Sequence, residues 1–233
     1  MLRHLISRSA GAASLLLLLT ASASASIVIT GTRVIYPSDA KEVSVKVSNK
    51  GKSPVLIQSW LDKGDTTAKP DQIRLPFSLT PPINRVEPGS GQTLRIRALA
   101  NNFPTNKETV LWLNVLEIPA KPMTTKEQEN YLQVAFRSRI KFFWRPKGLE
   151  GSAGEAPKKL VWRRDGSNLR VRNPTPYYVS FSDVSAGGKK ADGKMVAPFA
   201  EDTYALSVPA GGHIQAQYIN DFGAVVKQDY TVQ

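Results

Sequence analysis

The chain has 233 residues, with 31 Lys or Arg against 19 Asp or Glu, two His and no Cys. The absence of cysteine excludes a disulfide scaffold, a thiol nucleophile and a cysteine-ligated metal site, and two histidines argue against a multi-histidine metal site. A hydrophobic content of 41% is typical of a globular protein, and a net charge of +12 indicates an anionic partner such as nucleic acid, a charged surface or a peptide.

The first 25 residues are typical of an export signal. They carry two arginines, continue with a short apolar stretch over residues 10–23 and end in the small side chains of residues 23–25. The apolar stretch is too short to span a bilayer comfortably, which argues against the alternative of a membrane anchor. We therefore expect cleavage after Ala25, a mature chain that starts at Ser26, and no membrane insertion.

Residues 26–147 follow the pattern of β-strands. Residues 43–47 alternate valine with polar side chains, which is the period of a half-buried strand. Further candidate strands lie at residues 54–61 and 94–98. Residues 110–118 are apolar on both faces, which predicts a central strand. The longest candidate strand covers residues 131–144, where large apolar side chains alternate with other residues.

The β pattern resumes after a Gly/Ser-rich stretch over residues 148–154, which we interpret as the end of a linker. Residues 124–130 could form one helical turn at most, and no convincing amphipathic helix appears. Short strands separated by Gly, Pro, Asn and Asp turns predict an all-β chain with two β-sandwich domains, residues 26–147 and 148–233. The candidate strands of the second domain are residues 160–162, 169–171, 177–184, 204–208, 214–219 and 225–232.

The positive charge is concentrated in the first domain. Residues 26–148 carry 19 basic and 10 acidic side chains, a net charge of +9, whereas residues 149–233 carry 10 and 9, a net charge of +1. We therefore expect an anionic partner to meet the first domain.

No catalytic set of residues is present in the sequence. His213 is the single histidine outside the export signal, and a lone histidine in a strand is far more often structural than catalytic. The run Gly51-Lys52-Ser53 lacks the upstream glycine of a phosphate loop and is interpreted as a hairpin turn. The sequence thus predicts a binding protein and not an enzyme, with no cofactor and no metal site.

Four motifs of this chain resemble those of one known family. The run FPTNKETVLWLNVLEIP, residues 103–119, is similar to the signature of the periplasmic pilus-assembly chaperones, the PapD-like family. Residues 138–146 resemble the last strand of that family's first domain, and residues 173–178 and 218–223 resemble motifs of its second domain. The resemblance implies two immunoglobulin-like domains set at an angle, with a subunit-binding cleft between them.

The family resemblance also implies a function. A periplasmic chaperone of this kind binds, folds and caps pilus subunits in a 1:1 complex by lending them a strand, and delivers them to an outer-membrane usher. The donor strand would cover about residues 131–145, with Leu132, Val134 and Phe136 filling the open groove of the subunit. The alternative for these three side chains is the core of their own domain. The short segment 120–130 resembles the short-loop branch of the family.

Two further sets of residues match functional positions of the family. Arg33, expected on the first strand, and Lys141 match the pair that binds the subunit's C-terminal carboxylate, where two cations make charge-assisted hydrogen bonds. The alternative for both is an ordinary solvated surface. Glu108, Arg145 and Asp221 match an inter-domain ion network.

Two other classes of binding protein compete with a chaperone. A basic first domain with Trp112 and aromatic residues 142–144 fits the crude profile of a nucleic-acid binder, but an export signal argues against nucleic acid as the partner. A pilus structural subunit would be a single incomplete sandwich with a donor extension, whereas two sandwich-sized patterns directly follow the signal here.

Overall fold

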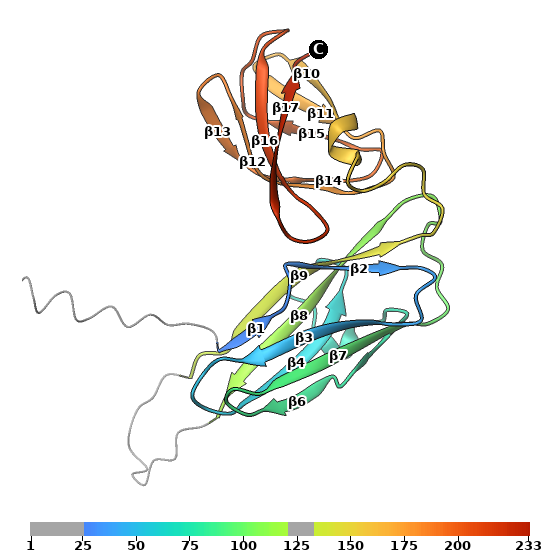
Figure 1. Ribbon diagram of the computed structural model, residues 1–233, viewed down its shortest axis with the longest axis vertical. Helices are drawn as coiled ribbons and strands as arrows, with labels where there is room; N and C mark the ends of the chain where they lie inside the picture. Colours follow the sequence, from blue (N-terminus) through green and yellow to red (C-terminus); the bar gives the residue numbers. More distant parts are fainter. Residues whose placement is uncertain (1–25, 121–132) are drawn as a thin grey trace, which may run out of the picture.

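The computed structural model describes residues 26–120 and 133–233 and shows strands throughout, which confirms the expected all-β fold. Strands β1 to β9 form one domain and β10 to β17 form the other, and Figure 1 shows the two set at an angle to each other. Two short 3-10 helices, η2 (Pro70–Gln72) and η3 (Ala156–Lys159), accompany them. No helix among the described residues is long and apolar enough to cross a membrane.

The first domain is a sandwich of two sheets. One sheet has the order β1-β3-β7-β5 and the other has the order β2-β9-β8-β4-β6, with β8 in its centre as the apolar pattern predicted. The strands are β1 (Ile27–Ile29), β2 (Arg33–Pro37), β3 (Val43–Asn49), β4 (Val55–Asp62), β5 (Phe77–Thr80), β6 (Ile83–Val86), β7 (Gly91–Ala98), β8 (Thr109–Pro119) and β9 (Phe136–Arg145).

Alternating apolar side chains fill the space between these sheets. Tyr36 is completely buried, stacks on Trp144 with ring centroids 5.3 Å apart, and its hydroxyl accepts a hydrogen bond of 2.9 Å from the Ala98 amide. Full burial of a large apolar side chain contributes about 1.5–3 kcal/mol. The even-numbered residues Phe142 and Trp144 of β9 belong to this core, so the C-terminal half of β9 is a structural strand of its own domain.

The second domain is a smaller sandwich around Trp162. Its sheets have the orders β10-β11-β15 and β13-β12-β16-β17, with β14 pairing with β12. Leu149 and Ala153, in the stretch expected to be a linker, pack against this core instead. The strands are β10 (Val161–Asp165), β11 (Asn168–Arg172), β12 (Val179–Ala186), β13 (Lys189–Asp192), β14 (Met195–Val196), β15 (Glu201–Tyr204), β16 (His213–Ile219) and β17 (Val225–Thr231).

The chain changes sheets between its first two strands. β1 pairs with β3, whereas β2 pairs in parallel with β9 in the opposite sheet. The change occurs at Gly31, whose φ of +91° lies in a region that L side chains rarely adopt. The sequence had suggested that Arg33 lies on the first strand, but Arg33 instead opens the second.

This sheet change leaves half of β9 open. β2 covers only Lys141–Arg145, because its register begins with Arg33 opposite Lys141. Among the described residues, Phe136–Ile140 therefore pair with β8 alone, and their other edge has no strand beside it.

Among the differences from the expected strand boundaries, those at β9 and β15 have clear physical reasons. β9 begins at Phe136, because its ladder with β8 ends there opposite Glu117; residues 133–135 of the expected longer strand are not in β9, and residues 131–132 lie outside the described residues. In the second domain the strand expected at residues 204–208 lies earlier, at Glu201–Tyr204, because these residues pair with β11. The expected turn at residues 124–130 and the short segment 120–130 lie outside the described residues, apart from residue 120.

Candidate functional site

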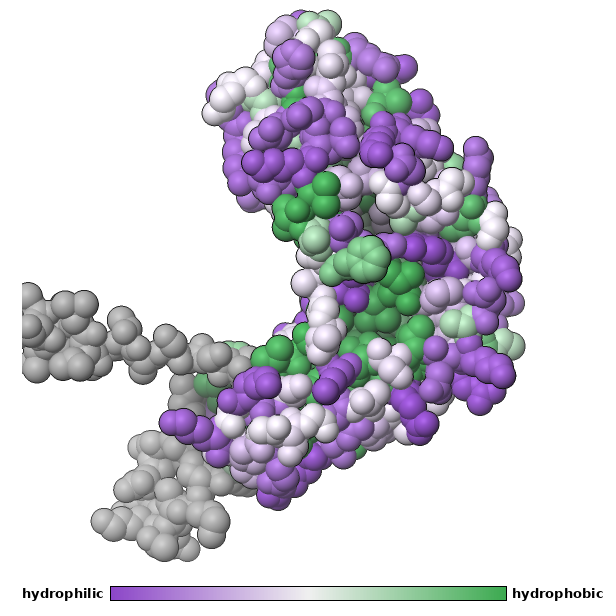
Figure 2. Space-filling view, viewed as in Figure 1, coloured by the Kyte–Doolittle hydropathy of each residue, from purple (hydrophilic) through white to green (hydrophobic). Residues whose placement is uncertain are grey.

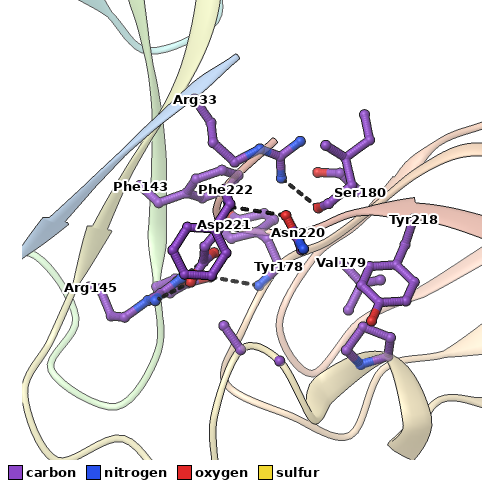
Figure 3. A pocket seen from close by; sticks show the side chains of 15 residues that line it. Arg33, Phe143, Arg145, Tyr178, Val179, Ser180, Tyr218, Asn220, Asp221 and Phe222 are labelled. Carbon is purple, nitrogen blue, oxygen red and sulfur yellow. Dashed lines mark hydrogen bonds and ion pairs between the residues drawn. The ribbon is translucent and has the colours of Figure 1, made fainter. Parts of the chain in front are cut away.

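The candidate site lies between the two domains, at the point where the open edge of β9 ends. Figure 2 shows apolar side chains gathered along the hollowed side of the molecule, where the domains face each other. A cavity of about 210 Å³ opens there, with Arg33, Phe143, Tyr178, Ser180 and Phe222 among its walls (Figure 3).

Arg33 spans from the first domain to the second. Its Nη1 donates a hydrogen bond of 2.8 Å to the carbonyl oxygen of Ile219 at the end of β16, and its guanidinium lies 6.0 Å from the ring centre of Phe143. Its Nε is buried and makes no hydrogen bond with the described residues. Burial lowers the pKa of Arg33, and the charges of Asp221 and Glu108 partly oppose this effect.

Lys141 is the direct neighbour of Arg33 in the β2–β9 ladder. Its Nζ is 3.0 Å from the hydroxyl of Ser180 on β12, so it also reaches the second domain. Burial and the positive charge of Arg33 lower the pKa of Lys141 to about 8. The structure thus brings together the two cations that the sequence resemblance selected.

Neither cation forms an ion pair with a carboxylate among the described residues. Two half-buried positive charges placed side by side are unfavourable unless an anion joins them. The fold therefore places a lysine ammonium and an incompletely bonded guanidinium side by side, and these are donor groups of the kind that bind anions.

The ion network beside this site connects the domains. Arg145, the last residue of β9, donates at 2.6 Å to Glu108 Oε1 and at 2.7 and 3.0 Å to the two oxygens of Asp221. Glu108 is 2% exposed, and its other oxygen accepts a hydrogen bond of 2.8 Å from the Tyr178 amide. Burial alone would lower the pKa of Arg145, but its hydrogen bonds to Asp221 and the charge of Glu108 raise it.

The described apolar residues expected to enter a partner are exposed and lie outside the core of their own domain. Val134 is 46% exposed just before β9, and Phe136, its first residue, is 37% exposed. Neither belongs to the first domain's core cluster, which argues against the alternative that they fill it. Leu132 lies outside the described residues.

The comparison with known families identifies the architecture. Residues 26–150 match the model described as pili and flagellar-assembly chaperone, PapD N-terminal domain, and residues 155–230 match the pili assembly chaperone PapD, C-terminal domain. The chain belongs to the PapD family of pilus-assembly chaperones. Chaperones of this family are periplasmic and non-enzymatic, and solved members have two immunoglobulin-like domains.

Named relatives support this assignment over most of the chain. The "Probable fimbrial chaperone YadV" of Escherichia coli K12 is 48% identical over 217 residues, covering 87% of this chain and 88% of the relative. The chaperone protein FimB/FhaD of Bordetella pertussis is 44% identical, covering 96% of this chain and 95% of the relative. The solved structure of the YadV chaperone has a TM-score of 0.75 at 44% identity and covers 89% of this chain and 100% of that one.

One similar structure contains a pilus subunit. The SafB chaperone of Salmonella enterica, solved in complex with the SafA pilin, has a TM-score of 0.77 at 30% identity, covering 91% of this chain and 99% of that one. The PapD-family fold of this chain is thus the fold of a protein that has been seen with a pilin bound.

Several residues of the chaperone's cleft were not found from the sequence. The Ser180 hydroxyl and the Ile219 carbonyl oxygen hold the two cations, and both belong to the second domain. On the first domain, Arg139 stacks on Trp112 at 4.9 Å and bonds both oxygens of buried Asp62, which fixes the middle of β9. The strand pattern of the sequence does not indicate these contacts, and only the fold shows them.

Proposed function

We propose that this chaperone captures a pilus subunit by holding its C-terminal carboxylate between Arg33 and Lys141. The observation that supports this most directly is the position of these cations, since both lie where the open edge of β9 meets the start of β2. A strand that adds to the open edge with its terminus at Lys141 gains ladder hydrogen bonds and two charge-assisted contacts together.

The geometry determines the direction of such a strand. The open residues Phe136–Ile140 precede Lys141 along β9, so a guest that ends at Lys141 must run beside them in the same direction as β9. β2 also runs parallel to β9, and it starts opposite Lys141. The guest strand is therefore parallel, and its terminus meets the beginning of β2 end to end.

The exposed apolar side chains next to this edge supply the second part of the contact. We propose that residues 132–136 extend β9 on a bound subunit, so that strand alternation directs Leu132, Val134 and Phe136 into the open groove of an incomplete subunit sandwich. Each side chain that becomes fully buried contributes about 1.5–3 kcal/mol. The ladder adds affinity with little dependence on the guest's sequence, which suits a chaperone for several subunits.

We further propose that the loaded chaperone docks on an outer-membrane usher through a separate surface. Leu56 on β4 and Ile83 on β6 are exposed apolar residues that share the outer face of their sheet. β8 lies between this surface and β9, so a subunit added to the open edge leaves Leu56 and Ile83 accessible.

The route to the periplasm belongs to the same proposal. We propose that residues 1–25 are an export signal removed after Ala25 and that the mature chain folds as two domains, residues 26–147 and 148–233. Two complete domains and the export signal favour this function over a nucleic-acid module and over a pilus subunit.

The carboxylate assignment is tested with peptides that copy a subunit's C-terminal strand. The free-acid peptide should bind the purified chaperone, and its C-terminally amidated form should bind about 30-fold more weakly or worse, because loss of a buried charge contact costs about 2–5 kcal/mol. Lys141→Met and Arg33→Ala should each reduce free-acid binding, and the double variant should lose less than the sum because both residues hold one group. Equal affinity for both peptides would refute the assignment.

A further inference from the structure

A buried carboxylate meets the beginning of the described chain. Glu117 on β8 is 6% exposed, and its Oε1 accepts hydrogen bonds from the amide of Ser26, at 3.2 Å, and from the Ser26 hydroxyl. Its Oε2 accepts a hydrogen bond of 2.9 Å from the Ile27 amide. No Lys or Arg among the described residues pairs with Glu117, and a buried carboxylate without a cation is costly.

Ser26 is held at this place from two sides. Its carbonyl oxygen accepts a hydrogen bond of 2.7 Å from the Lys50 amide, and the next residue, Ile27, pairs with Asn49 of β3. A Cβ on Gly51 would lie 2.5 Å from the Ser26 Cβ, so only glycine permits this approach. The Ser26 nitrogen is therefore fixed beside Glu117 by packing on the opposite sheet.

We propose that Glu117 is the receptor for a new amino terminus, which processing creates at Ser26. Hydrolysis by a signal peptidase breaks the amide bond between Ala25 and Ser26, the water oxygen stays with the Ala25 carboxylate, and the Ser26 nitrogen becomes an ammonium group. This ammonium group then forms the ion pair that buried Glu117 lacks. The inference rests on the proposed removal of the export signal and is independent of subunit capture.

This pairing makes the stability of the folded domain depend on removal of the export signal. Before cleavage, the Ser26 nitrogen is an amide with one donor and no charge, so Glu117 is held by hydrogen bonds but has no cationic partner among the described residues. After cleavage the same nitrogen carries a positive charge at hydrogen-bond distance. A precursor that still has to be threaded across the inner membrane is thus less stable as a folded domain than the mature chaperone. A terminus one residue away would place the charge outside this contact.

The first measurement is the mature terminus itself. Intact mass of the chaperone purified from periplasm should correspond to a chain that starts at Ser26, and any other start would overturn the proposal. The pKa of the α-amino group, followed by NMR or by the pH dependence of amine labelling, should lie at least one unit above the ordinary value of about 7.7–8.0. In Glu117→Gln, which keeps an oxygen acceptor, it should return to that ordinary range.

The second measurement is a thermodynamic cycle between the terminus and Glu117. A chain that retains Ala25 in front of Ser26 should melt about 2–4 °C below the mature chain. In the Glu117→Gln background the same extension should have little effect, and Glu87→Gln, at an exposed ion pair, should leave the effect of the extension unchanged. An extension that costs equal stability in the wild type and in the Glu117→Gln variant would show that the terminus is not paired with this carboxylate.

A second inference concerns the turn between β16 and β17. Phe222 is 93% exposed, yet its backbone is firmly held, since Asn220 Oδ1 accepts hydrogen bonds from the amides of Phe222 and Ala224 at 3.1 and 3.0 Å. Gly223, with a φ of +83°, packs so closely on Thr32 that a Cβ would lie 2.6 Å from the threonine hydroxyl oxygen. The second domain thus presents an exposed aromatic side chain on an ordered backbone turn beside Arg33 (Figure 3).

We infer that Phe222 binds an apolar side chain near the C-terminus of the captured subunit. The cavity beside Arg33 also has Phe143, Val179 and Pro157 in its walls, so it offers apolar surface next to the carboxylate site. An aromatic ring whose backbone is already ordered adds contact area at a small entropic cost. This inference rests on the proposed capture and gives it selectivity for the terminal side chains.

Two free-acid peptides that differ only in their last two residues, either leucine or glycine, test this inference. The wild-type chaperone should prefer the leucine peptide, and Phe222→Ser should bind it about tenfold more weakly and lose the preference. Leu99→Ser, which removes an exposed apolar side chain elsewhere, should change neither. Equal binding of both peptides by the wild type would overturn the role of Phe222, whereas lost discrimination between acid and amide would overturn the carboxylate site.

Discussion

Capture of a carboxylate by Lys141 should be accompanied by proton uptake. In the free chaperone, burial and Arg33 lower the pKa of Lys141 to about 8, so about half of the lysines are neutral at pH 8. A bound carboxylate favours the ammonium form and raises this pKa by two units or more, because an opposite charge at hydrogen-bond distance has that effect. Binding at pH 8 should therefore take up about half a proton, and above pH 8 the affinity should fall about tenfold per pH unit.

Calorimetric titration with an N-acetylated free-acid peptide measures this uptake. The observed enthalpy, plotted against the ionisation enthalpy of several buffers at pH 8, should have a slope of about half a proton for the wild type. Arg33 and Arg145 stay charged near pH 8. The Lys141→Met variant keeps every other titratable group, including the amino terminus, so the difference between its slope and that of the wild type is the contribution of Lys141. A wild-type slope near zero, or an equal slope in Lys141→Met, would refute the reasoning.

The same pKa shift predicts how the stability of the free chaperone depends on pH. Because the folded pKa of Lys141 lies below its ordinary value of 10.5, its charge destabilises the fold fully below about pH 8, and this cost disappears as the pH rises toward 10.5. Lys141→Met should therefore raise Tm at pH 7, by an amount equivalent to at most about 3 kcal/mol and less after solvent screening.

Three further predictions concern other parts of the chaperone. Arg145→Ala should lower the free energy of unfolding by about 3 kcal/mol and loosen the domain arrangement in solution scattering, because it leaves two carboxylates unpaired, one 35% exposed. The control Arg85→Ala, at an exposed ion pair, should cost under about 1 kcal/mol. An equally small effect of Arg145→Ala would contradict the ion network. Val134→Glu and Phe136→Glu should abolish subunit co-purification from periplasm and leave Tm unchanged, since both side chains are exposed; early melting would place them in the core instead. Leu56→Glu should leave the subunit complex intact and prevent its binding to usher-containing membranes, and normal usher binding would rule this surface out.

Local periodicity predicted those parts of the fold that depend on neighbouring residues in the chain. The valines of β3 alternate with polar residues because one face of β3 is buried, and β8 is a continuous apolar run because it lies in the centre of its sheet. Both patterns are visible in the sequence. The sheet change at Gly31 depends instead on which distant strand accepts the chain, and no periodicity records that choice.

The candidate site was predictable to the extent that it resembles a family motif. Arg33 and Lys141 are ordinary basic residues by composition, and the resemblance alone selected them from 31. Their partners Ser180 and Ile219 belong to the other domain, 39 and 186 positions away in the chain, so a single sequence could not connect them. The role of Glu117 could not be predicted for the same reason, because Glu117 and Ser26 are 91 positions apart in the chain.

The open half of β9 also bears on self-association of the free chaperone. A bare strand edge invites pairing with the same edge of a second copy. Antiparallel pairing of Phe136–Ile140 with the same edge of a second copy would place Arg137 of one molecule opposite Arg139 of the other, and like charges opposite each other oppose strand pairing. The terminal carboxylate of a subunit would instead be attracted by the basic side chains of this edge. We therefore expect the positive charge of the first domain to oppose self-association at this edge and to favour a partner with a negative charge.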